Sequence, residues 1–144
     1  MIKSIRAEDV YDLAVGITAI NALGTIFSMK PDDNATVDWS YIFINIVSDN
    51  TGNSSNAGYL TKRARVSFHL VCKKTLWSTD TPERVLGNMI DVLNNNLVNQ
   101  WCTKINGFWW LLVQSILEDA VSPIFLEDGR YYQVKDYLFS YLCV

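Results

Sequence analysis

The chain has 144 residues and a formal net charge of −3, with 49% hydrophobic and 19% charged residues. This length is normal for one globular domain whose core needs no metal or disulfide, so we predict a single domain over residues 1–144. The negative charge provides no basic field for a phosphate backbone, so a dedicated nucleic-acid binder is not expected. The low charged fraction leaves apolar surface that an oligomer interface could cover.

The first thirty residues predict a helix followed by a short strand. Four apolar residues recur at the i, i+3, i+4, i+7 spacing of one helical face: Val10, Leu13, Ala14 and Ile17. We therefore predict a helix over about residues 5–22, which Gly24 ends, and a strand over residues 25–29 before Pro31. No apolar leader precedes the helix and no apolar run is long enough for a bilayer, so synthesis in a cytoplasm without membrane insertion is expected.

Residues 41–47 and 63–72 show the period of two that is typical of half-buried antiparallel strands. The apolar residues on one face of these runs are Ile42, Ile44 and Ile46, and Ala64, Val66, Phe68, Leu70 and Cys72. One face is therefore expected in the core and the other against water or a partner. The polar residues 48–58 are too many for a two-residue turn, so they predict a projecting loop.

The second half begins with the clearest helix start of the chain, Thr81-Pro82-Glu83, with a capping hydroxyl before a proline at the first helical position. We predict that this helix runs to about residue 98 with one apolar face: Leu86, Met89, Ile90, Leu93 and Leu97. Residues 108–117 predict a buried strand, central in the sheet, and residues 130–143 a long final strand.

These elements predict an α+β fold with a mostly antiparallel sheet of about five strands and two helices packed on one face, in the order α-β-β-β-α-β-β. Each element has a single apolar face. We therefore predict that the faces of the first two long strands and of the second helix meet in one core.

Motifs for catalysis or metal binding are not recognised in the sequence. His69 is the only histidine, and it lies on the polar face of its strand beside Arg65 and Ser67. A base needs a positioned partner, so an exposed or hydrogen-bonded histidine is the better interpretation. Three cysteines without a C-x-x-C pair are predicted to be reduced core residues: Cys72, Cys102 and Cys143. We expect a protein that is not an enzyme and uses no cofactor and no metal.

Three segments in this element order carry a family resemblance: residues 38–46 (DWSYIFINI), 58–66 (GYLTKRARV) and 127–141 (EDGRYYQVKDYLFSY). The chain resembles the tail terminator, or tail-completion, proteins of long-tailed bacteriophages. The resemblance implies an α+β fold, a hexameric ring that caps the tail tube and ends its polymerisation, and a surface on which the filled head docks. Trp39-Ser40 stands where the family usually has a proline, and residues 50–56 are unusually rich in Asn and Ser.

The resemblance also implies partners and a location. The partners would be copies of this chain in the ring, the tail tube protein, and a head-side connector or stopper protein. DNA would pass through the lumen without specific binding, and the protein would reside in the virion after assembly in the host cytoplasm. Two alternatives stay open: a head-side neck or stopper protein, and a small α+β ligand-binding or enzymatic dimer with Trp77 and Trp101 at a pocket.

We predict that polar loop residues contact a partner. Because a cyclic ring needs contacts between two different surfaces of the subunit, we also predict that a basic and an acidic set meet between neighbouring copies. The loop residues are Asn50, Asn53, Ser54 and Asn56; the basic residues are Lys62, Arg63 and Arg65, with Lys73 and Lys74 nearby; the acidic residues are Glu118, Asp119, Glu127 and Asp128. The alternative is that the charges form two solvated and unrelated faces.

Overall fold

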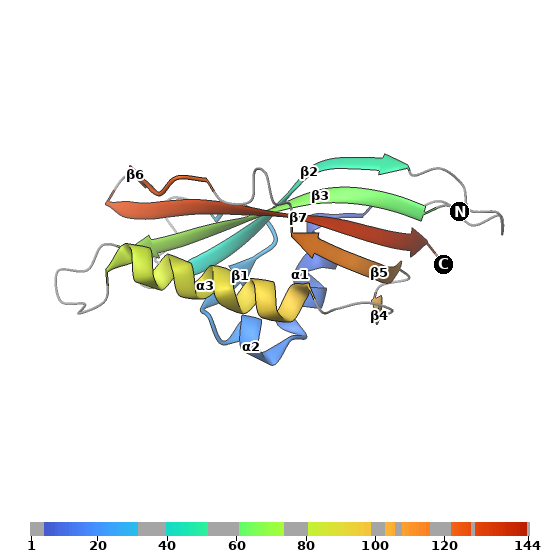
Figure 1. Ribbon diagram of the computed structural model, residues 1–144, viewed down its shortest axis with the longest axis horizontal. Helices are drawn as coiled ribbons and strands as arrows, with labels where there is room; N and C mark the ends of the chain where they lie inside the picture. The colour runs from blue at the N-terminus through green and yellow to red at the C-terminus, as the bar shows by residue number, and fades with distance from the viewer. Residues whose placement is uncertain are drawn as a thin grey trace.

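The computed structural model describes residues 5–31, 40–51, 61–73, 81–98, 103–105, 108–115, 122–127 and 129–143. Seven strands within these residues form one sheet, in the order β1-β2-β3-β7-β5-β4, with β6 also paired to β7 (Figure 1). Their bounds are β1 Thr25–Phe27, β2 Tyr41–Thr51, β3 Thr61–Lys73, β4 Thr103–Ile105, β5 Phe108–Ser115, β6 Phe125–Glu127 and β7 Arg130–Cys143. Every pair is antiparallel except β1 with β2. The predicted α+β class with a mostly antiparallel sheet is confirmed, and β4 and β6 are additional short strands.

The described helices are α1 (Ala7–Val15), α2 (Thr18–Asn21) and α3 (Pro82–Leu97), and they lie on one face of the sheet (Figure 1). The prediction of one helix over residues 5–22 is wrong, because Ile17 has an extended backbone (φ −94°, ψ 109°) that separates α1 from α2. Gly16, which precedes this break, is a poor helix former. The apolar stripe nevertheless continues, since Ile20 of α2 is fully buried in the same core.

Helix α3 begins as predicted. The Thr81 Oγ1 atom accepts a hydrogen bond from the backbone N–H of Arg84 at 3.3 Å, and Pro82 occupies the first helical position. A hydroxyl cap and a proline both suit the first turn, where backbone N–H groups have no helical partner. This start fixes the register in which α3 presents its apolar face to the sheet.

The core lies between the helices and one face of the sheet, and it unites the apolar faces predicted for β2, β3 and α3. Its members include Ile42, Ile44, Ala64, Val66, Phe68, Leu70, Leu86, Met89 and Leu93, with Ile46 and Ile90 packed against them. Strand β7 adds Tyr137, whose ring contacts Phe68 edge to face with centroids 5.6 Å apart. The prediction that these three faces meet in one core is confirmed. No helix in the described part of the chain is long and apolar enough to cross a membrane.

Two predicted positions in the sheet are corrected. Strand β2 extends to Thr51, so residues 48–51 belong to the strand rather than to the predicted loop, and residues 52–60 lie outside the described residues. Strand β5 is not central, because it is next to the last strand in the sheet order and only the three-residue strand β4 lies beyond it. The central pair is β3 with β7, which matches β3 along its whole length from Thr61 opposite Leu142 to Lys73 opposite Arg130.

Candidate functional site

The helix-free face of the sheet carries a second apolar cluster near the start of β2. Tyr41, Val71 and Tyr132 lie in register across β2, β3 and β7, with Phe43 next along β2. Tyr41, Phe43 and Val71 are only 2%, 8% and 0% exposed. This end of the face is therefore buried within one subunit, although alternation alone placed it against water or a partner.

Arg130 fixes this cluster at the start of β7. Its Nη1 atom donates a hydrogen bond to the Tyr41 hydroxyl at 3.1 Å, and its guanidinium lies 5.6 Å from the Tyr41 ring centroid. Beside it, the Tyr132 ring stacks on Phe125 of β6, with centroids 5.3 Å apart and planes 12° apart. An arginine over an aromatic face is held both by its charge and by ring contact.

His69 belongs to the same face and stacks on Phe43, with ring centroids 4.3 Å apart and planes 8° apart. Burial lowers the pKa of His69 below its ordinary value, the nearby positive charge of Lys30 lowers it further, and Asp136 opposes this shift. The imidazole therefore favours its neutral form. Its described surroundings support a packing role.

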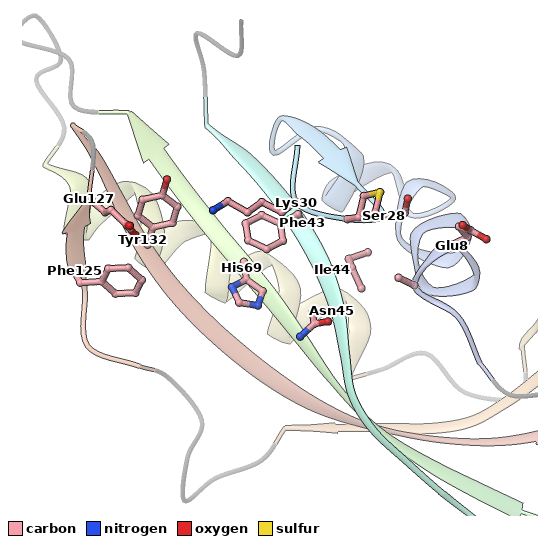
Figure 2. A pocket seen from close by; sticks show the side chains of 12 residues that line it. Glu8, Ser28, Lys30, Phe43, Ile44, Asn45, His69, Phe125, Glu127 and Tyr132 are labelled. Carbon is pink, nitrogen blue, oxygen red and sulfur yellow. The ribbon is translucent and has the colours of Figure 1, made fainter. Parts of the chain in front are cut away.

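A pocket of about 590 Å³ opens beside these aromatic side chains. Its aromatic walls are Phe43, His69, Phe125 and Tyr132, and the charged side chains that line it are Glu8, Lys30 and Glu127 (Figure 2). We call this the aromatic pocket. The lining comes from segments far apart in the sequence, from α1 to β7, so strand periodicity alone did not find it.

A polar network follows on the same face, where Asn45, Ser67 and Asp136 lie in register. One carboxylate oxygen of Asp136 accepts hydrogen bonds from Arg65 Nε at 2.9 Å and Nη2 at 2.6 Å, and the other accepts from Ser67 Oγ at 2.5 Å. Asp136 is only 8% exposed and Ser67 only 4% exposed. A buried carboxylate needs such partners to offset the loss of water.

This network changes the interpretation of Arg65. The sequence placed Arg65 in a basic set that contacts another subunit, but its guanidinium is already bound to Asp136 of the same chain. Its intrachain contact is explained by the register, since Ser67 and Asp136 are directly opposite across β3 and β7. Sequence periodicity identified the strand but gave no sign of this long-range partner.

The remaining predicted interface residues are scattered along the sheet. Asn50 of β2 is opposite Arg63 of β3, Lys62 is adjacent in β3, and Glu127 lies in β6 opposite Arg130. Arg63 and Glu127 are exposed. Other predicted residues lie outside the described part of the chain: Asn53, Ser54, Asn56, Lys74, Glu118, Asp119 and Asp128, together with Trp77 and Trp101.

Arg63 and Glu127 lie near opposite ends of β7, since Arg63 is level with Ser140 and Glu127 with Arg130. Ten residue steps of strand separate these levels by roughly 33 Å. Within one subunit the basic and acidic residues that the structure describes are therefore not brought together.

The described residues give no support for metal binding or for a reactive thiol. Within them, no group of three or more His, Cys, Asp or Glu side chains is placed to hold a metal ion. Cys72 is a buried member of the core outside any disulfide, as predicted, and burial raises the pKa of its thiol. A raised pKa keeps the thiol protonated and less nucleophilic.

Comparison of the chain with protein-family models and with curated proteins gives no match. The family resemblance therefore rests on the order of elements and on the three segments quoted above.

Proposed function

We propose that this chain is a structural protein of a long-tailed bacteriophage that forms a ring, with six copies as the family implies, on the end of the tail tube. The observation that carries this proposal is the element order. The sequence begins with a helical segment, a short strand and the long β2–β3 hairpin. A helix capped by Thr81 and two longer strands, β5 and β7, come after them. The resemblance to tail terminator proteins rests on this same order.

The exposed apolar surface supports a protein whose work is binding other proteins. The large apolar side chains that are exposed among the described residues are Met29 (71%), Val47 (52%), Phe125 (46%) and Leu126 (55%). Met29 and Phe125 line the aromatic pocket, whose lining also includes the charged side chains of Glu8, Lys30 and Glu127. An apolar centre with a polar rim is the usual anatomy of a protein interface.

In the proposed role, the ring binds the last layer of the tail tube on one side and offers the head a different surface on the other side. Growth of the tube stops because the outer side of the ring does not repeat the tube's own binding surface. Six copies at −3 each give the ring a formal charge of −18. Such a ring would not hold passing DNA through phosphate contacts.

The test is to measure the mass of the purified protein by sedimentation and then its binding to purified tail tubes. A hexamer would have a mass of about 98 kDa, six times the 16.4 kDa chain. We expect this ring, alone or on tubes, and tubes of fixed length in electron micrographs when it is present. A ring that binds only the head-side connector would support the neck-protein alternative, and a dimer that never binds tubes would contradict the proposal.

A further inference from the structure

We propose that neighbouring copies join by edge-to-edge strand pairing, with residues 44–51 of β2 in one copy bonded to residues 111–115 of β5 in the next. We call these segments the β2 edge and the β5 edge. The number of copies in the assembly rests on the proposed function, but the pairing itself is argued from the sheet.

The β2 edge is open over most of its length within the described structure. Strand β1 pairs only with the first three residues of β2, Tyr41, Ile42 and Phe43. From Ile44 to Thr51, β2 pairs with β3 on one side, and no described strand lies on the other side. A strand in this position presents a row of N–H and C=O groups that a further strand can bind.

The β5 edge, at the opposite margin of the sheet from β2, is also open over most of its length within the described structure. Strand β4 pairs only with Phe108, Trp109 and Trp110. Residues 111–115 of β5 pair with β7 on their inner side, and no described strand lies on their outer side. The subunit therefore has two open edges that differ in sequence, as a head-to-tail contact requires.

The two edges lie at the same end of the sheet (Figure 1). The register links Asp49 to Ala64, Phe139 and Val113 across four strands, and Ile46 to Val66, Tyr137 and Ser115. A second copy placed beside the first with little shift along the strands therefore brings its β5 edge to the first copy's β2 edge.

Strand direction also fits this contact. Each neighbour in the series β2, β3, β7, β5 is antiparallel, so β2 and β5 of one copy run in opposite directions. When the next copy keeps the same orientation, its β5 is antiparallel to the first copy's β2, and the alternation continues. Pairing of β2 with another β2 would instead give a two-fold dimer with no open edge of that kind left.

Each edge contains a register irregularity that limits where pairing can occur. In β2 it falls at Val47, which is 52% exposed, and in β5 at Leu111. Regular segments of equal length follow, residues 48–51 and 112–115. Irregularities of this kind twist an edge and discourage indiscriminate pairing, so they restrict the contact to a matched partner.

The predicted charge sets do not suit this side-by-side arrangement. Arg63 and Glu127 are level with residues ten positions apart along β7, so a neighbour with little shift along the strands leaves them apart. The open edges, and not these two charged residues, then close the ring.

Lysine substitution at the irregularity provides the first test. Val47→Lys puts a charged side chain on the β2 edge, where lysine is a natural block to pairing. Ala19→Lys is the control, because Ala19 is also an exposed apolar residue but lies in α2, outside the β2 edge. We expect V47K to be folded by circular dichroism and to sediment as a monomer, and A19K to assemble like the unmodified chain. Assembly of V47K at the unmodified level would overturn the proposal.

Paired cysteines provide the second test. Asp49→Cys is combined with Val113→Cys or Ser115→Cys, since a shift by an even number of residues keeps the same faces together. Mild oxidation should give a ladder of cross-linked copies in one of these pairs, because opposite side chains in paired strands are close enough for a disulfide. The control pair, Asp49→Cys with Leu126→Cys, should give no ladder. An intact assembly with no ladder in either test pair, or D49C alone giving cross-linked dimers, would overturn the edge contact.

The two proposals fail separately. A ladder in a protein that never binds tail tubes leaves the edge contact standing and removes the proposed function. If tubes are capped by an assembly that never cross-links through these edges, the proposed function stands and the edge contact is removed.

Discussion

Lys135 and Asp136 are adjacent in β7, and both are buried although their side chains lie on opposite faces of the sheet. Lys135 is 2% exposed and in register with Phe68 on the helix-covered face, with its Nζ atom 5.1 Å from the Tyr137 ring centroid. Asp136 joins Arg65 and Ser67 on the helix-free face. Burial lowers the pKa of Lys135, and the charge of Asp136 opposes this shift. Strand β7 therefore buries one ionisable group on each face of the sheet.

Replacing Lys135 with methionine should leave the free energy of unfolding unchanged or raise it by up to about 2 kcal/mol, because a buried charge is costly to desolvate. The lowered pKa means that the unfolded chain binds more protons, so the unmodified protein should gain stability as the pH rises toward about 10.5. Urea melts at several pH values measure both effects. A K135M variant with the same pH profile as the unmodified chain would contradict this account of Lys135.

Replacing Asp136 with asparagine removes the charge that Arg65 and Ser67 share and should cost about 1–3 kcal/mol of unfolding free energy. The lower part of this range is favoured because the Arg65 side chain is 35% exposed to solvent. A double-mutant cycle of D136N with Arg65→Met isolates their coupling. Arg63→Met, two residues away and exposed, is the matched control. Additive losses in the Arg65 cycle would show that the pair contributes nothing to stability.

Phe68→Ala should cost about 3–5 kcal/mol, the usual range for a buried phenylalanine. Phe68 is fully buried and packs against Tyr137, so truncation leaves a cavity beneath the helices. Leu126→Ala on the exposed strand β6 should change the unfolding free energy by less than about 0.5 kcal/mol. Denaturant melts of both variants test the β3 register, which would be wrong if F68A lost under about 1 kcal/mol.

His69 predicts a pH dependence on the acid side. Its pKa is lowered in the folded chain, so the unfolded chain takes up the proton first as the pH falls through about 6.5. The free energy of unfolding should therefore decrease from about pH 7 toward pH 5 and stop responding to this group below its folded pKa. His69→Gln should flatten the curve in that window. Equal slopes for both proteins would assign the dependence to other groups.

The sequence predicted those parts of the fold that depend on one element at a time. Alternation placed Phe68 and Val66 in the core correctly, and the Thr81 cap marked the start of α3. The helix prediction for residues 5–22 missed the break at Ile17, because the apolar spacing on both sides of Ile17 suits one continuous helix. A local extended conformation within a periodic segment leaves little trace in the pattern.

Features that depend on strand order could not be read from periodicity. The pairing of Arg65 with Asp136 joins residues 71 positions apart, and it exists only because β7 lies beside β3. The aromatic pocket likewise needs β6 folded back on β7, so that Phe125 meets Tyr132. The same long-range order moved β5 away from the centre of the sheet.

The position of β7 has a consequence for synthesis on the ribosome. Strand β7 pairs with β3, β5 and β6, yet it follows all three in the sequence. Until it emerges, the nascent chain holds β3 without one neighbour, and Phe68 lacks the cover of Tyr137. Exposed edges and apolar surface at that stage are prone to misassociation. We therefore expect this domain to fold only after β7 has been translated, with chaperones holding the incomplete sheet until then.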